Sequence, residues 1–155
     1  MRNTSLCHIE KDGKYLMLHR VKKENDLNRD KWVGIGGKFE DGESPEECNA
    51  REVLEETGLT LLNAHYRGIV TFVSDKWETE YMHLFTSRNF HGTLTECDEG
   101  VLEWVPKNKL EELHLCEGDK IFFRLLDEGY PFFSLKLVYE NENLIHIVLD
   151  GKKIK

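Results

Sequence analysis

The sequence predicts a mixed α+β fold, and three observations carry that prediction. Strand-like and helical segments interleave without the regular β-α-β spacing of a doubly wound parallel sheet. One short segment carries both start and stop signals for a helix. A chain of 155 residues is most simply a single domain. We therefore expect residues 1–155 to fold as one unit around one sheet.

The first part of the chain predicts a β-hairpin, a loop and a short extended segment. Residues 4–11 and 14–20 read as strands, and Asp12-Gly13 between them is a strong two-residue hairpin turn. Residues 21–31 are polar and predict a loop. Residues 32–39 are rich in glycine and predict a short extended segment.

An acidic helix is the element with the clearest boundaries. Ser44 is a favourable N-cap, and Pro45 suits the first helical position. Glu47 lies three residues after Ser44 and completes a capping box. Gly58 supplies the left-handed residue that ends many helices. These signals predict a helix over residues 45–57.

This helix gathers carboxylates on one face. Glu52, Glu55 and Glu56 span about 100° of arc at about 100° per residue. A solvated charged face is the usual interpretation of such a pattern, but acids near a helix C-terminus are disfavoured by the helix dipole. A hard divalent cation with oxygen ligands would stabilise them, and Mg²⁺ is the usual choice beside phosphates. The residues expected to pack on the core from the opposite side are Ala50, Val53 and Thr57.

The rest of the chain predicts further strands and two short helical segments. The expected strands are 61–73, 79–88, 101–105, 132–140 and 143–150, the last two forming a hairpin. A loop is expected over 91–97, and helical segments are expected over 107–113 and 118–127.

Composition excludes several classes of function. The net charge of −8 argues against binding polymeric nucleic acid, although a nucleotide is compatible if metal ions supply positive charge. The four cysteines form no C-x-x-C pair, which favours free thiols in a reducing cytoplasm. The N-terminal residues contain no apolar run long enough for a signal peptide or a membrane span. We therefore expect a cytoplasmic protein, either a monomer or a homodimer.

The stretch GKFEDGESPEECNAREVLEETGL, residues 37–59, resembles the signature of the Nudix hydrolase family, G-x5-E-x7-R-E-U-x-E-E-x-G-U, where U is a bulky apolar residue. The specified positions are all matched without a gap, by Gly37, Glu43, Arg51, Glu52, Val53, Glu55, Glu56, Gly58 and Leu59. The resemblance implies the Nudix fold, an α/β/α sandwich around a mixed β-sheet. It also implies metal-dependent hydrolysis of a nucleoside diphosphate-linked substrate.

The same resemblance implies roles for individual residues. The metal ligands would be Glu52, Glu55, Glu56 and the carbonyl of Gly36, holding Mg²⁺ with Mn²⁺ as the alternative. Arg51 flanks the acidic face and can pair with Glu55 or Glu43; by resemblance Arg51 and Glu43 orient the helix. One further loop acid is expected as a metal or catalytic residue, with Glu99 preferred over Asp98 and Glu96. Glu56 and Glu99 both remain candidates for the general base.

Three segments outside this stretch resemble the MutT-type diphosphatases, which remove oxidised purine nucleoside triphosphates from the nucleotide pool. They are residues 32–38, residues 117–126 and residues 132–136. The expected reaction is hydrolysis of 8-oxo-dGTP, or of purine triphosphates more broadly, to nucleoside monophosphate and pyrophosphate. The alternatives are an ADP-ribose, dinucleoside polyphosphate or coenzyme A pyrophosphatase, or a non-catalytic nucleotide-binding regulatory module.

Candidates for substrate binding follow from the same segments. Glu117 and Asp119 offer carboxylates for the N–H donors of a guanine edge, and aromatic rings can stack on the base. The candidates for this stacking wall are Trp32, Phe72 and Phe122, and ordinary core packing is favoured at least as much for Phe72 and Phe122. This chain has Val33 where mammalian members carry an asparagine that reads the base, and Leu27 where they carry an aromatic residue. The complete set of substrate-binding candidates is Arg20, Trp32, Val33, Lys38, Phe72, Glu117 and Asp119, with Arg20 and Lys38 expected at the phosphates.

Overall fold

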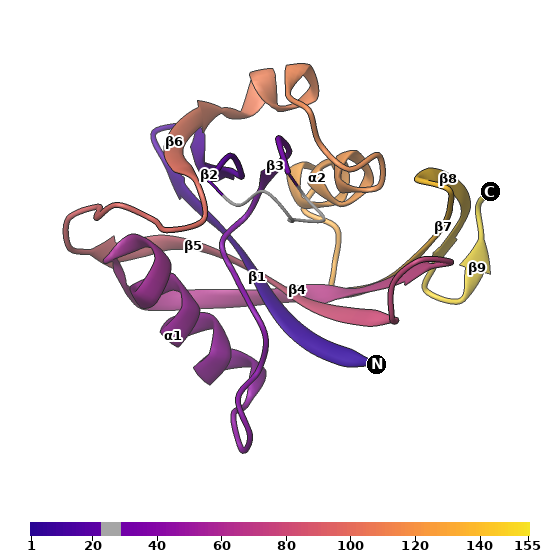
Figure 1. The fold of residues 1–155 in the computed structure, drawn as a ribbon, viewed down its shortest axis with the longest axis horizontal. Helices are drawn as coiled ribbons and strands as arrows, with labels where there is room; N and C mark the ends of the chain where they lie inside the picture. Colours follow the sequence, from indigo (N-terminus) through magenta and orange to yellow (C-terminus); the bar gives the residue numbers. More distant parts are fainter. Residues whose placement is uncertain (23–28) are drawn as a thin grey trace.

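The computed structural model describes residues 1–22 and 29–155 (Figure 1). Within these residues the strands are β1 (Arg2–Lys11), β2 (Lys14–His19), β3 (Trp32–Val33), β4 (Thr60–Ser74), β5 (Glu80–His91), β6 (Val101–Pro106), β7 (Phe133–Glu140), β8 (Asn143–Leu149) and β9 (Lys152–Lys153). The helices are α1 (Pro45–Thr57) and α2 (Asp119–Asp127), together with the 3₁₀ helix η1 (Lys107–Glu112).

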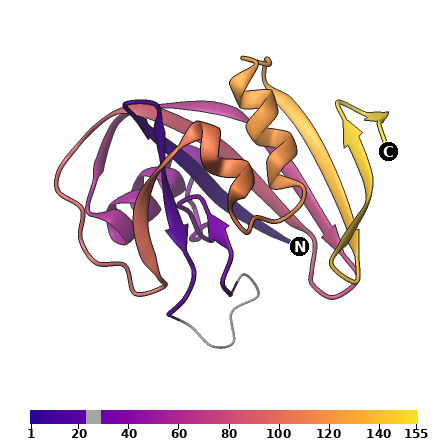
Figure 2. The same cartoon turned by 90° about the horizontal axis from the view of Figure 1, so that it is seen from above.

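The strands form one mixed sheet, which confirms the expected fold class. Their order is β3-β2-β1-β5-β4-β7-β8-β9, and β6 pairs with β2. Strands β1 and β5 run parallel, as do β4 and β7, whereas the other pairs are antiparallel. Helix α1 lies on one face of the sheet, and η1 and α2 cover the other (Figures 1 and 2).

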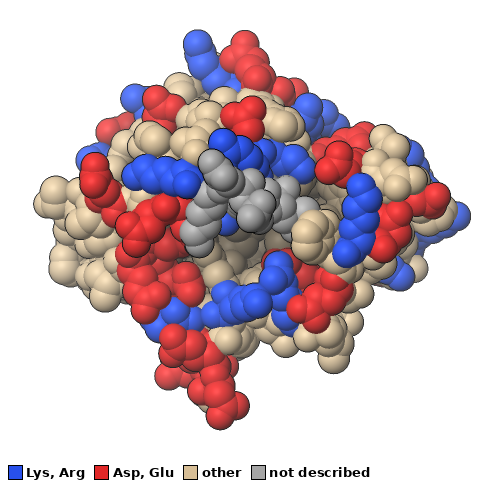
Figure 3. Space-filling model, in the orientation of Figure 1, with Lys and Arg blue, Asp and Glu red and all other residues tan. Residues whose placement is uncertain are grey.

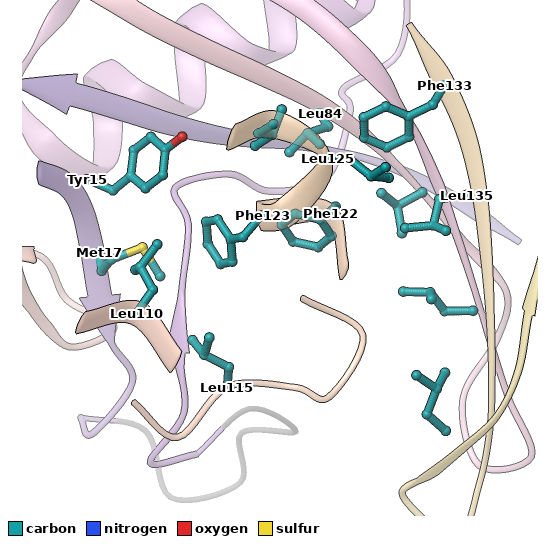
Figure 4. Packing of buried hydrophobic residues seen from close by; sticks show 14 of the residues in the cluster. Tyr15, Met17, Leu84, Leu110, Leu115, Phe122, Phe123, Leu125, Phe133 and Leu135 are labelled. Atoms are coloured by element: carbon teal, nitrogen blue, oxygen red, sulfur yellow. The ribbon is translucent and has the colours of Figure 1, made fainter. Parts of the chain in front are cut away.

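Each face has its own hydrophobic core. On the α2 side, Phe122 and Leu125 pack with Phe133 and Leu135 of β7 (Figure 4). On the α1 side, Val53 packs with apolar residues of β1 and β2. Phe122 is completely buried in the first of these clusters, so its alternative assignment to the core is the correct one.

The local signals of α1 act as expected. The Ser44 hydroxyl accepts a hydrogen bond from the Glu47 N–H at 3.1 Å, and the Glu47 carboxylate accepts one from the Ser44 N–H at 2.9 Å. Gly58 ends the helix with φ of 80°. The helix therefore spans residues 45–57, as the capping pattern predicts.

The orientation of α1 differs from the prediction. Ala50 was expected to pack on the core, but it is exposed, whereas Asn49 and Val53 are buried. The inward arc of the helix also includes Glu52 and Glu56, which are both partly buried. The acidic residues are therefore not opposite the core side. The two carboxylates lie on the side that faces the sheet, because the neighbouring backbone leaves space for them there.

The C-terminal end of the chain forms a short strand, β9, that was not predicted from the sequence. Strand β9 pairs with β8 through a turn at Asp150 and Gly151, where φ is 49° and 81°. This is the same Asp-Gly signal that predicts the first hairpin, where Asp12 and Gly13 have φ of 52° and 74°. The loop expected over 21–31 is described only at its two ends.

Candidate active site

A cavity of about 620 Å³ opens on the face of the molecule shown in Figure 3. Acidic side chains gather on this face over α1 and the loop before it, and Lys and Arg side chains flank the hollow. Nine of the residues proposed from sequence for catalysis, metal or substrate binding line it: Arg20, Val33, Gly36, Lys38, Glu52, Glu56, Phe72, Glu99 and Asp119. Residues from widely separated parts of the chain therefore meet in one cavity.

The glycine pair before α1 lets the backbone pass between β1 and the helix. A Cβ on Gly36 would lie 1.8 Å from the Ser5 carbonyl oxygen, and one on Gly37 would lie 2.6 Å from the Glu52 carboxylate. The Gly36 N–H donates a hydrogen bond of 3.0 Å to the Glu56 carboxylate. The close approach thus brings backbone groups and carboxylates together at one end of the cavity.

The carboxylates at this end repel one another and are poorly hydrated. Burial raises the pKa of Glu56 well above its ordinary value, and the adjacent Glu99 carboxyl raises it further. Burial also raises the pKa of Glu52. These acids therefore favour either a shared proton or a cation that compensates their charge.

Arg51 organises the other carboxylates of this region. Its Nε and Nη2 donate to the two oxygens of Glu43 at 2.6 and 2.9 Å. Its Nη1 donates to Glu52 at 2.8 Å and to Glu55 at 3.1 Å, and Nη2 also reaches the Lys38 carbonyl at 3.0 Å. The guanidinium holds the pKa of Glu43 down at about 2. Both pairings expected for Arg51 are thus present together.

The donor set fits a divalent cation. Glu52, Glu56 and Glu99 line the same cavity with oxygen donors, and burial combined with mutual repulsion gives them a reason to bind one. Glu55 fits less well, because its side chain is 58 % exposed and lies outside the cavity wall. Over residues 1–22 and 29–155, no three acidic, histidine or cysteine side chains are already grouped as a metal-binding set. Arg51 donates to Oε1 of Glu52, so a cation bound through Oε2 would leave that hydrogen bond in place.

The structure distinguishes between the candidate loop acids by their position. Glu99 lines the cavity, and its carboxylate accepts a hydrogen bond of 3.1 Å from Arg20 Nη1. Asp98 and Glu96 are exposed and do not line it. Position therefore favours Glu99 for a role beside Glu56.

At the other end of the cavity, Asp119 and Phe72 form part of the wall. The Phe72 ring lies 5.1 Å from that of Tyr139. Loss of hydration raises the pKa of Asp119 to about 7, so at neutral pH this group can either donate or accept a hydrogen bond. An aromatic wall, together with a carboxyl group that can donate or accept a hydrogen bond, can hold a planar base.

Two of the proposed substrate-binding residues lie elsewhere. The Trp32 ring stacks on His19 with 4.4 Å between ring centroids and does not line the cavity. Glu117 is exposed, accepts a hydrogen bond of 3.2 Å from the Leu144 N–H, and lines a smaller adjoining cavity of about 230 Å³. Leu27 lies outside the described residues.

Much of the cavity wall was not predicted from the sequence. Strand register brings Arg2 opposite Glu80 and Thr4 opposite Met82, so the four side chains enter the cavity together. Arg2 Nη2 then pairs with Glu80 at 2.7 Å. Other unpredicted wall residues include Trp77, Cys116, Leu137 and Tyr139. No local signal marks them, because they meet only through the pairing of distant strands.

A family model described as a NUDIX domain matches residues 1–126. The chain belongs to the Nudix hydrolase family. It is 29 % identical over its whole length to an uncharacterised Nudix hydrolase of Bacillus subtilis, YvcI, and covers 98 % of that protein. It is 35 % identical over 114 residues, 72 % of each chain, to an oxidised purine nucleoside triphosphate hydrolase of Danio rerio.

Solved Nudix structures agree with this fold. A MutT protein of Bacillus halodurans superimposes with a TM-score of 0.86 over 97 % of this chain and 98 % of its own, at 28 % identity. The chain thus has the Nudix fold and the pyrophosphohydrolase activity of its family, whose members typically use a divalent metal and bind small nucleotide substrates. Among the described residues, every helix is too short or too polar to cross a membrane.

The raised pKa of Glu56 predicts a pH-dependent stability difference. The pKa of Glu56 is higher in the folded state than in the unfolded state. Its contribution to folding stability is therefore fully present below the unfolded-state pKa and is lost as pH rises through the folded-state pKa. Glutamine resembles the protonated acid. We therefore expect Glu56→Gln to have the same free energy of unfolding as wild type at about pH 5 and a higher one at about pH 8. Urea unfolding in EDTA measures this; a difference that does not grow with pH contradicts it. Glu46→Gln, at an exposed position of the same helix, is the control.

Proposed function

We propose that this Nudix hydrolase cleaves purine nucleoside triphosphates, with oxidised dGTP as the preferred substrate, to nucleoside monophosphate and pyrophosphate. The observation that carries this proposal is a single cavity with partly buried carboxylates at one end and an aromatic wall with Asp119 at the other. The similarity to the purine triphosphate hydrolase of Danio rerio supports it. We further propose that residues 1–155 act as one domain.

The carboxylate end suits hydrolysis of a phosphoanhydride. Glu52, Glu56 and Glu99 would hold the divalent cation, together with the Gly36 carbonyl. When bound, this cation neutralises charge on phosphate oxygens and lowers the pKa of a coordinated water. Glu56 or Glu99 can accept the proton of the attacking water. Arg51 cannot act as the base, because a guanidinium has no acceptor and keeps its proton.

The cations along the cavity would position the phosphates. Lys38 and Arg20 both line it. Arg20 is paired with Glu99 at 3.1 Å, so it can hold that carboxylate in place while facing the substrate. In-line cleavage needs fixed positions for water, phosphorus and leaving group, and these two cations would help to fix the phosphates.

The base end supports the proposed preference for a purine. Asp119 can bond to the N–H donors of a guanine edge, and 8-oxidation adds a donor at N7. Val33 lines the cavity but offers no polar side chain, so recognition of the base rests on Asp119. Phe72 and Tyr139 add two aromatic rings to the cavity wall.

A substrate panel with Mg²⁺ tests this function. We expect kcat/KM to be highest for 8-oxo-dGTP, then for dGTP, GTP and ATP, and lower for CTP, ADP-ribose and a dinucleoside tetraphosphate. The Glu56→Gln variant, purified in the same way, excludes a contaminating enzyme. ADP-ribose or the dinucleoside tetraphosphate as the best substrate would overturn the purine triphosphate assignment. Nucleotide binding without any turnover would instead support the alternative of a non-catalytic regulatory module.

A further inference from the structure

Trp77 lies in an otherwise polar hairpin turn. The turn joins β4 to β5 and reads SDKWET from Ser74 to Thr79. The Trp77 side chain is 51 % exposed and belongs to neither hydrophobic core cluster. Among the described residues, its ring stacks on no other aromatic ring. Single exposed apolar side chains are common on protein surfaces, so it is the position of Trp77 at the cavity wall, and not its exposure alone, that indicates a role.

Trp77 lies between two adjoining cavities. It lines both the large cavity and the adjoining cavity of about 230 Å³, and the wall that both share is Phe72, Trp77, Cys116 and Tyr139. Figure 1 shows the β4–β5 turn on the opposite side of the molecule from α1. Trp77 is thus at the end of the cavity away from the carboxylates, where the base of a nucleotide would lie.

The hairpin turn is held on both sides of Trp77. Before it, the Asp75 carboxylate accepts hydrogen bonds of 3.3 Å from the Asn141 N–H in the β7–β8 turn. After it, the Thr79 carbonyl accepts a hydrogen bond of 3.0 Å from the Arg2 N–H. Contacts with two other elements therefore fix the turn before a ligand arrives, which reduces the entropy cost of binding.

We propose that Trp77 is the stacking residue for the base, and that it selects planar aromatic bases with a large face. The indole would lie against one face of the base, while Asp119 bonds to its edge. A purine offers more overlap than a pyrimidine and gains more from this contact. The proposal deepens the proposed function, on which its choice of substrate rests, by naming the residue that favours nucleotides with a purine.

Kinetics of two substitutions test the proposal. We expect Trp77→Ala to raise KM for dGTP about 5- to 150-fold with little change in kcat, as for a lost base–aromatic stack. Trp77→Phe should recover most of the affinity.

Two controls accompany these substitutions. Tripolyphosphate has no base, so its rate of hydrolysis, or its inhibition constant if it is not hydrolysed, should be the same in all variants. Phe132→Ala removes another exposed aromatic, 56 % exposed and outside the cavity, and should leave KM unchanged. Unchanged KM in Trp77→Ala overturns the proposal.

Fluorescence tests Trp77 without turnover. The chain has three tryptophans, at positions 32, 77 and 104. We expect a non-hydrolysable dGTP analogue with Mg²⁺ to quench wild-type emission and that of Phe132→Ala, and to quench Trp77→Phe much less. If no nucleotide is hydrolysed but this pattern holds, the proposed function fails and the role of Trp77 stands. If hydrolysis proceeds and Trp77→Phe is quenched as strongly as wild type, the role of Trp77 fails alone.

Discussion

Glu56→Gln is expected to lower kcat with Mg²⁺ about 10²- to 10⁴-fold, the range for loss of a general base, while leaving the protein folded. The glutamine keeps the shape of the side chain, and its oxygen can still accept the 3.0 Å hydrogen bond from the Gly36 N–H. It cannot take a proton from water, and it is a poorer ligand for a hard cation. This variant should therefore lose activity without losing stability.

Initial rates of pyrophosphate release, together with thermal midpoints measured in EDTA, check this prediction. The midpoint should be no lower than that of wild type, because the amide removes a buried charge. The matched control is Glu46→Gln, in the exposed first turn of the same helix, which should keep activity within about twofold of wild type. Near-wild-type turnover by Glu56→Gln would remove Glu56 from the mechanism.

Arg51→Ala is expected to raise the Mg²⁺ concentration needed for half-maximal activity about 10- to 100-fold, as for other residues that orient metal ligands. The guanidinium donates to Glu43, Glu52 and Glu55 in the structure. Without it, three carboxylates lose a shared partner, and Glu43 in the loop before α1 loses both of its hydrogen bonds to Arg51. Arg51→Lys should be intermediate, because an ammonium cannot bond both Glu43 oxygens as the planar fork does.

Magnesium titrations of activity measure this effect. Arg124→Ala serves as the control, since Arg124 also pairs with a glutamate, Glu111 at 3.1 Å, but both side chains are about two-thirds exposed at 66 % and 64 %. Such a surface pair contributes little. Equal magnesium dependence in Arg51→Ala and Arg124→Ala would show that Arg51 does not orient the metal ligands.

Local sequence signals predict those parts of the fold that depend on neighbouring residues. The capping box at Ser44 and the glycine at position 58 define both ends of α1, and Asp12-Gly13 defines the first hairpin. The family signature brings the carboxylates of the site together for the same reason, since they share one helix and the loops beside it. The roles proposed for these residues remain predictions.

Features that depend on tertiary packing could not be predicted in this way. Ala50 is exposed and Glu52 and Glu56 are partly buried, because the glycine pair before α1 makes room for the two carboxylates. Trp32 stacks on His19 in the β2–β3 pair, so it turns away from the cavity that Trp77 lines. Which tryptophan reaches the cavity is decided by strand register and the β4–β5 turn, and no local pattern encodes either.

The most direct measurement of the central claim is phosphorus NMR of the products formed from dGTP with Mg²⁺. Cleavage between the α- and β-phosphates, assisted by a cation held by the α1 carboxylates, predicts pyrophosphate and dGMP in equal amounts, and no products when EDTA replaces the metal. Orthophosphate with dGDP, or an equal rate in EDTA, would contradict it.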